Sequence, residues 1–282
     1  MTDPSPSLSP PALEVIAVER SFGGVKALQG LDLRVEAGEF AALIGPNGSG
    51  KSTLVNVITR MINADAGVVR IAGADVTRER RHRIIRHGVA RSFQHVRLIP
   101  ELTLRENAEL GSVFHDLGRP FGTLRTWFGR GTRRADGAAV EEALDVMEVP
   151  EALRDSVPSK VPFAAQRHTE IARALVSRPQ LLLLDEPVAG MNPAEVQNFL
   201  KILRSINASG TAILLIEHNM EFVMEAAQWI TAMNRGQRIA HGPAEDVRRD
   251  PAVIEAYLGA RRAAATGAST DPSIHVHEGG GK

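Results

Sequence analysis

The nonapeptide GPNGSGKST, residues 45–53, constrains this chain more than any other feature. It fits the pattern G-x-x-x-x-G-K-[ST] and stands between EFAALI, a run typical of a strand, and GKSTLVNVITRMI, typical of a helix. Glycines let the backbone wrap around an anion, and the start of the helix adds partial positive charge. We expect Lys51 to reach the β- and γ-phosphates of a nucleotide and the Ser52 hydroxyl to bind Mg²⁺. The predicted phosphate-binding residues are Gly45, Pro46, Asn47, Gly48, Ser49, Gly50, Lys51, Ser52 and Thr53.

Two adjacent carboxylates follow a second apolar run. Residues 181–184 are all leucine, as a strand buried on both faces requires, and Asp185 and Glu186 come next. Asp185 is suited to hold Mg²⁺ through water, and Glu186 to orient or deprotonate an attacking water. A plain strand-end turn is the alternative interpretation. The presence of a phosphate loop favours the chemical roles, because such a loop needs both a metal partner and a means of activating water.

The order of patterns predicts an α/β fold with a helical insertion. Strand patterns open the chain, helix patterns dominate from about residue 103 to 176, and strands then alternate with helices. The insertion accounts for the long separation between Lys51 and Asp185. We place the main domain at residues 12–259, with the helical part at about 95–180. The Pro/Ser-rich residues 1–11 and the Ala/Gly-rich residues 260–282 are predicted to be disordered tails.

Composition excludes several classes of protein. The chain of 282 residues has no cysteine, which removes a disulfide scaffold, thiol catalysis and thiolate metal sites. Lys and Arg number 33 and so do Asp and Glu, so a generally basic nucleic-acid binder is not expected. No apolar run approaches the roughly 18 residues of a membrane span, and residues 1–11 lack a signal-peptide core. We therefore expect a cytoplasmic protein that reaches a membrane only by docking on another chain.

Together these motifs resemble the ATP-binding subunits of ABC transporters, most closely those of the branched-chain amino acid importer type. The resemblance runs from about residue 12 to 258 and includes SFQHVRLIPELTLRENAELG, LLLLDEPVAGMNP and LLIEHNMEFVM. It implies a P-loop NTPase core of the ABC ATPase type, an antiparallel β subdomain and an inserted helical subdomain. The ligands implied are ATP and Mg²⁺. The basic stretch RERRHRIIRHG is, in this family, a solvated helix.

The resemblance also assigns roles to three single residues. Phe22 falls where the family stacks an aromatic ring on adenine, Gln94 matches a glutamine that senses Mg²⁺, and His218 matches a histidine that contacts the γ-phosphate. Each has a plainer alternative: a core phenylalanine, a solvated glutamine at a strand end, or a histidine at a helix start. Gln94 and His218 each follow a predicted strand, which favours the functional roles, because ligands bind at the carboxyl ends of parallel strands.

The signature motif departs from the family. Relatives carry LSGGQ, or LSYGQQ and LPYGLQ in this branch, where this chain reads VPFAAQ at residues 161–166. In the family this loop contacts the nucleotide of the opposite subunit. Pro162 lacks a hydroxyl and an N–H group, and Ala164 adds a Cβ or forbids a positive φ. Either the contact is weakened, or the helix dipole and the remaining N–H groups suffice.

The resemblance implies partners as well. We expect a heterodimer with a second ATP-binding subunit, two transmembrane permease subunits, an indirect link to a solute-binding protein, and a location on the cytoplasmic face of the membrane. Nucleic acid is not an expected partner. Two other functions stay open: a regulatory nucleotide-binding module with little turnover, and an ABC-type ATPase of DNA repair or translation. The latter proteins carry a long coiled coil or a second ATPase domain, and this sequence shows neither.

Overall fold

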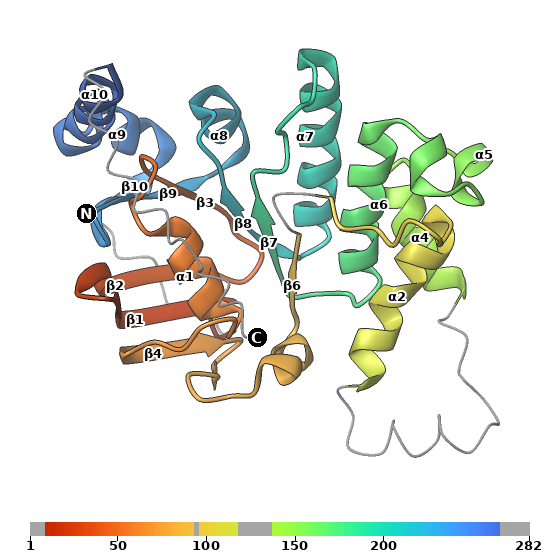
Figure 1. The fold of residues 1–282 in the computed structure, drawn as a ribbon, viewed down its shortest axis with the longest axis horizontal. Coiled ribbons are helices and arrows are strands. Elements are labelled where there is room, and N and C mark those ends of the chain that lie inside the picture. Colours follow the sequence, from red (N-terminus) through yellow and green to blue (C-terminus); the bar gives the residue numbers. More distant parts are fainter. Residues whose placement is uncertain (1–8, 93–95, 118–136, 266–282) are drawn as a thin grey trace, which may run out of the picture.

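Two sheets and a helical layer make up the chain in the computed structural model, which describes residues 9–92, 96–117 and 137–265 (Figure 1). The first sheet holds four antiparallel strands in the order β2-β1-β4-β5. The second holds six strands in the order β10-β9-β3-β8-β7-β6, parallel except for β10 at the edge. These sheets confirm the predicted α/β core and its antiparallel subdomain.

The strands lie at these bounds: β1 Leu13–Phe22, β2 Val25–Val35, β3 Phe40–Ile44, β4 Ala66–Ile71, β5 Ala74–Asp75, β6 Val89–Arg91, β7 Leu181–Asp185, β8 Ala212–Ile216, β9 Trp229–Asn234 and β10 Gln237–Pro243. The helices are α1 Lys51–Ile58, α2 Leu104–Leu117, α4 Gly137–Val146, α5 Glu151–Arg154, α6 Phe163–Leu175, α7 Pro193–Ala208, α8 Met220–Ala226, α9 Ala244–Arg249 and α10 Pro251–Ala265. Two 3-10 helices, η1 Arg81–His87 and η2 Pro158–Lys160, complete the described elements.

The central strands are apolar throughout because both of their faces are covered. Every residue of β3, β7 and β8 is buried. Side chains alternate between two core clusters: Ala42 and Leu184 pack with the helices on one face, whereas Ala41 and Leu183 pack with α1 and the antiparallel sheet on the other. Because these three strands are parallel, their carboxyl ends lie at the same edge of the sheet.

The helices between β6 and β7 form the layer on the right of Figure 1, from α2 to α6. Local signals fix where several helices begin. Thr103 and Glu106 exchange hydrogen bonds ahead of α2, and Asn192 and Glu195 form the same reciprocal capping box at α7. Among the described residues, no helix has both the length and the apolarity to cross a membrane.

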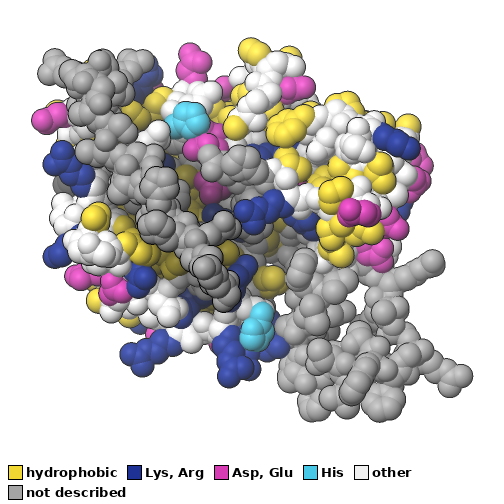
Figure 2. Space-filling view, viewed as in Figure 1, with side chains coloured by type: hydrophobic (Ala, Val, Ile, Leu, Met, Phe, Trp, Pro, Cys, Tyr) yellow, Lys and Arg dark blue, Asp and Glu magenta, His cyan; other side chains and the backbone are white. Residues whose placement is uncertain are grey.

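Two segments test the finer expectations. Helix α10 continues to Ala265, so residues 260–265 are helical rather than part of a disordered tail; their sequence, ARRAAA, consists of strong helix formers. The other tail residues 1–8 and 266–282 lie outside the described residues. The basic stretch around η1 buries Ile84 and exposes its arginines, which Figure 2 shows gathered at the lower edge of the molecule.

Candidate functional site

The loop between β3 and α1 has a shape that only glycine permits at two positions. Gly45 has a φ of 151°, and a Cβ there would lie 2.2 Å from the Met233 carbonyl oxygen. Gly50, at the start of α1, has a φ of 104°, and its Cβ would lie 2.5 Å from the Ala27 oxygen. Strands β2 and β9, which are distant in sequence from the loop, thus pack directly against its backbone. The loop is held in a curved form whose concave side can receive an anion.

Lys51 lies across that concave side. Its Nζ donates to the carbonyl oxygens of Gly45 at 2.6 Å and Pro46 at 3.1 Å. Burial lowers the pKa of the Lys51 ammonium, and the carboxylates of Glu186 and Asp185 act in the opposite direction. The structure therefore brings the predicted lysine and both predicted carboxylates into one electrostatic neighbourhood.

Asp185 ends β7 and is 8% exposed. Its Oδ2 accepts from Nη2 of Arg91 at 3.1 Å, and the same guanidinium donates from Nη1 to Asn56 in α1 at 2.8 Å. Arg91 ends the neighbouring strand β6 opposite Leu183 of β7, and its side chain reaches Asp185 two residues further along β7. The sequence analysis missed Arg91, because a strand-end arginine carries no motif of its own.

Glu186 and His218, predicted to act on the attacking water and on the γ-phosphate, lie close together. Nδ1 of His218 lies 3.5 Å from Oε1 of Glu186, and the His218 side chain is 63% exposed. Glu217, which precedes His218 and is fully buried, accepts hydrogen bonds from the backbone N–H groups of His218 at 2.9 Å and of Asn219 at 3.2 Å. This carboxylate fixes the turn that presents His218, and the sequence analysis did not single it out.

A buried arginine holds the backbone at Glu186. Arg167 in α6 donates to the carbonyl oxygens of Glu186 at 2.9 Å and Pro187 at 3.2 Å. It also pairs with Glu170 at 2.9 Å, and both side chains are almost completely buried. Helix α6 is thereby tied to the residue that follows β7. Sequence patterns place these two charges on a helix but give no sign that they are buried.

Of two further predicted site residues, the structure describes Phe22 but not Gln94. Phe22 is 43% exposed at the end of β1, with the Arg20 guanidinium 4.7 Å from the centre of its ring. It is therefore not a core residue, and the Arg20 guanidinium lies over one face of its ring. Gln94 lies outside the described residues, so its predicted contact with Mg²⁺ stays a prediction.

The altered signature segment forms the start of α6. Pro162 is the residue before the first helical turn, with φ −57° and ψ 150°, and among the described residues no side chain caps the N–H groups that follow it. Ala164 adopts ordinary helical backbone and has no positive φ. The concern that alanine forbids a required left-handed conformation thus does not apply in this structure. What remains at this end is an uncapped helix N-terminus with an exposed Phe163 beside it.

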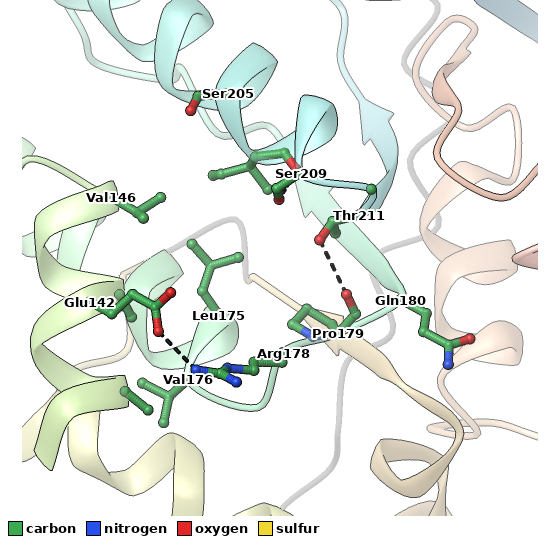
Figure 3. A pocket seen from close by; sticks show the side chains of 14 residues that line it. Glu142, Val146, Leu175, Val176, Arg178, Pro179, Gln180, Ser205, Ser209 and Thr211 are labelled. Atoms are coloured by element: carbon green, nitrogen blue, oxygen red, sulfur yellow. Dashed lines mark hydrogen bonds and ion pairs between the residues drawn. The ribbon is translucent and has the colours of Figure 1, made fainter. Parts of the chain in front are cut away.

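A cavity of about 430 Å³ lies elsewhere, between α4, α6 and α7 (Figure 3). Its floor includes Pro179, Gln180 and Thr211, which precede β7 and β8, and Glu142 and Arg178 form an ion pair at its side. This is the amino end of the sheet, whereas Asp185 and His218 follow the carboxyl ends. The cavity is therefore separate from the phosphate loop.

The fold and the site together define a nucleoside triphosphatase of the phosphate-loop class. A family model described as ABC transporter matches residues 28–189, and one described as Branched-chain amino acid ATP-binding cassette transporter matches residues 237–263. The chain belongs to the ABC transporter family, as an ATP-hydrolysing subunit.

Individual relatives agree with this assignment. The high-affinity branched-chain amino acid transport ATP-binding protein BraF of Pseudomonas aeruginosa is 36% identical over 262 residues, covering 89% of this chain and 99% of BraF. LivG of Escherichia coli, with the same description, is 37% identical over 259 residues, covering 89% of this chain and 99% of LivG. Among solved structures, the ADP conformation of MJ1267, an ATP-binding cassette of an ABC transporter, has a TM-score of 0.77 at 30% identity, covering 90% of this chain and 100% of MJ1267.

Proposed function

We propose that this ATPase powers the import of branched-chain amino acids or similar small polar solutes. The observation that carries the choice of cargo is the second family match, at residues 237–263, in a part of the chain separate from the general ATPase model. The names of BraF and LivG support the same cargo class. We further propose that residues 12–259 form the ATPase domain.

The geometry supports a division of roles within the nucleotide site. Phe22 would stack on the adenine, the loop of residues 45–53 would wrap the phosphates, and Lys51 would exchange the Gly45 and Pro46 carbonyls for phosphate oxygens. Glu186 would orient the attacking water, and His218, held 3.5 Å from it, would contact the γ-phosphate. These roles supply positioning and charge neutralisation, which are the main needs of phosphoryl transfer.

The residues present suit a nucleotide-bound Mg²⁺. Among the described residues, no group of three or more His, Cys, Asp or Glu side chains is arranged to hold a metal ion, so a cage built from protein alone is not formed there. The Ser52 hydroxyl and the Asp185 carboxylate are hard oxygen donors, and Mg²⁺ is commonly held by one or two such groups together with phosphates and water. When bound, the ion neutralises charge on the phosphates. Gln94, outside the described residues, is proposed as a third donor.

We propose that the working unit is a heterodimer with a second ATP-binding subunit, bound to two permease subunits on the cytoplasmic face of the membrane. A solute-binding protein would deliver the cargo to the permeases. The uncapped N-terminus of α6 supports this arrangement, because its N–H groups are available for a phosphate bound by the other subunit. Nucleic acid has no part in the proposal.

The test is transport by the assembled complex in proteoliposomes. The chain is co-expressed with permease subunits, a second ATP-binding subunit and a solute-binding protein from the same organism. We expect ATP-dependent uptake of labelled leucine, and none when Glu186→Gln replaces this subunit. Uptake of other solutes with no uptake or binding of leucine, isoleucine or valine would contradict the cargo assignment while leaving the ATPase assignment intact.

A further inference from the structure

The last helix contacts the first residue of the phosphate loop. The backbone N–H group of Gly45 donates to the hydroxyl oxygen of Tyr257 at 2.9 Å, although the two residues are 212 positions apart. We propose that Tyr257 is a positioning residue for the phosphate loop, and that through it helix α10 sets the affinity for ATP. The proposal depends on nucleotide binding alone and not on the cargo.

Helix α10 is placed by local and tertiary features that direct Tyr257 inward. Asp250 accepts from the N–H of Ala252 at 2.8 Å, and Pro251 occupies the first helical position, so the start of the helix is fixed. Val253 is 4% exposed and anchors the helix in the core. Tyr257 lies one turn further on the same face, and its ring packs against the same core cluster.

Gly45 is the residue at which a small displacement would matter most. It directly follows β3, and the Met233 carbonyl oxygen occupies the space where a Cβ would lie. Its own carbonyl oxygen accepts from Lys51 Nζ at 2.6 Å. When Lys51 turns toward a phosphate, that bond is given up. The bond from Gly45 N–H to Tyr257 then remains to hold the entrance of the loop, because it uses the other side of the residue.

The contact depends on a hydroxyl group rather than on aromatic bulk. Burial raises the pKa of the Tyr257 phenol, so it stays a neutral group at physiological pH and its oxygen accepts the N–H. Phenylalanine would keep the ring packing and remove only this acceptor. The Gly45 N–H would then be left without its partner.

The experiment compares Tyr257→Phe with the unmodified full-length chain in ATP binding measured by calorimetry. We expect ATP affinity to fall about three- to tenfold, the effect of one lost hydrogen bond. In the assembled transporter, KM for ATP should rise by a similar factor while kcat stays nearly constant. Leu258→Ala, the adjacent residue on α10, is the matched control: its side chain is 51% exposed, and ATP affinity should not change.

A second measurement leaves Tyr257 unmutated. Tyr257 is the single tyrosine of the chain, so 3-fluorotyrosine labels one position, and we expect its ¹⁹F resonance to shift when ATP is added. The shift should be absent in the labelled Lys51→Ala chain. If Tyr257→Phe binds ATP like the parent chain, or if the resonance does not respond to ATP, the proposal is wrong. If Tyr257→Phe fails to fold, the resonance of the unmutated chain decides.

Discussion

Glu186 shows how single residues prepare this site. Its backbone lies in the left-handed region at a φ of 46°, which costs a non-glycine residue roughly 1–2 kcal/mol. The N–H of Glu186 donates to the Ile216 carbonyl at 2.9 Å, and its own carbonyl accepts from Arg167. These bonds hold the unusual conformation in place. The result is a carboxylate that leaves the end of β7 toward His218 and Lys51 instead of continuing the strand.

This geometry predicts that two substitutions impair different steps, one turnover and the other ATP binding. Glu186→Gln should keep ATP binding and reduce turnover by about 10²- to 10⁴-fold, because it removes the group that acts on water. Lys51→Ala should weaken ATP binding itself, since it removes the partly buried cation on the concave side of the loop. Equilibrium ATP binding and steady-state phosphate release by the assembled complex measure the two effects. Equal losses of affinity in both variants would contradict the assigned roles.

At the scale of elements, His168 connects helix α6 to helix α7. Its ring stacks on Phe199, with the ring centres 5.9 Å apart. Burial lowers the pKa of His168 from its ordinary value of 6.5, and a hydrogen bond to the Met147 backbone opposes the shift more weakly. The folded protein thus favours the neutral imidazole, and acid weakens the attachment of α6 to its neighbour.

The sign of the pH dependence follows from linkage. Below an ordinary histidine pKa, the unfolded chain binds a proton at His168 that the folded chain resists, so stability is full above about pH 6.5 and declines as pH falls toward the depressed pKa. One group contributes at most about 1.4 kcal/mol per pH unit. The free energy of unfolding, measured with urea at several values between about pH 5 and pH 7.5, should change less steeply with pH in His168→Gln than in the parent chain. An unchanged slope would show that His168 does not contribute. The slope should not vanish, because His241 has a lowered pKa as well.

At the scale of the whole molecule, we propose that the chain supplies the groups for its own nucleotide and an altered segment for a partner's. Lys51, Asp185, Glu186 and His218 converge on one loop, whereas Pro162 lies at the start of α6 with its helix end uncapped. We therefore expect the isolated chain to bind ATP and to turn it over slowly. Full activity of the chain alone would contradict the heterodimer proposal.

Restoring the common signature residues tests this division between the two sites. Pro162→Ser combined with Ala164→Gly should leave ATP affinity of the isolated chain unchanged and raise turnover in the assembled complex. The gain reaches about tenfold if one hydrogen bond worth ~1.4 kcal/mol is regained in the transition state. The double change is also combined with Glu186→Gln. A gain that persists in this background belongs to the partner's site, whereas no gain in the complex would mean that the segment does not act as proposed.

Local sequence was sufficient for the parts of the site that are contiguous. The loop at residues 45–53 can be recognised from its glycines, its lysine and the flanking strand and helix, because the groups that bind phosphate lie within a few residues of one another in the sequence. The leucine run before Asp185 likewise predicts a strand buried on both faces, which β7 confirms. Exact helix ends were less predictable, as the extension of α10 to Ala265 shows.

Only the tertiary structure decided which distant residues support the site. Arg91, Arg167, Glu217 and Tyr257 carry no motif, yet each contacts a predicted site residue or the backbone beside it. Their roles come from strand pairing, helix docking and burial, which join segments up to 212 positions apart. The sequence does not distinguish a charged or hydroxyl side chain that is solvated by water from one that is buried against a partner. The sequence by itself therefore determined the nucleotide chemistry, and the packing of the chain decided which side chains hold that chemistry in position.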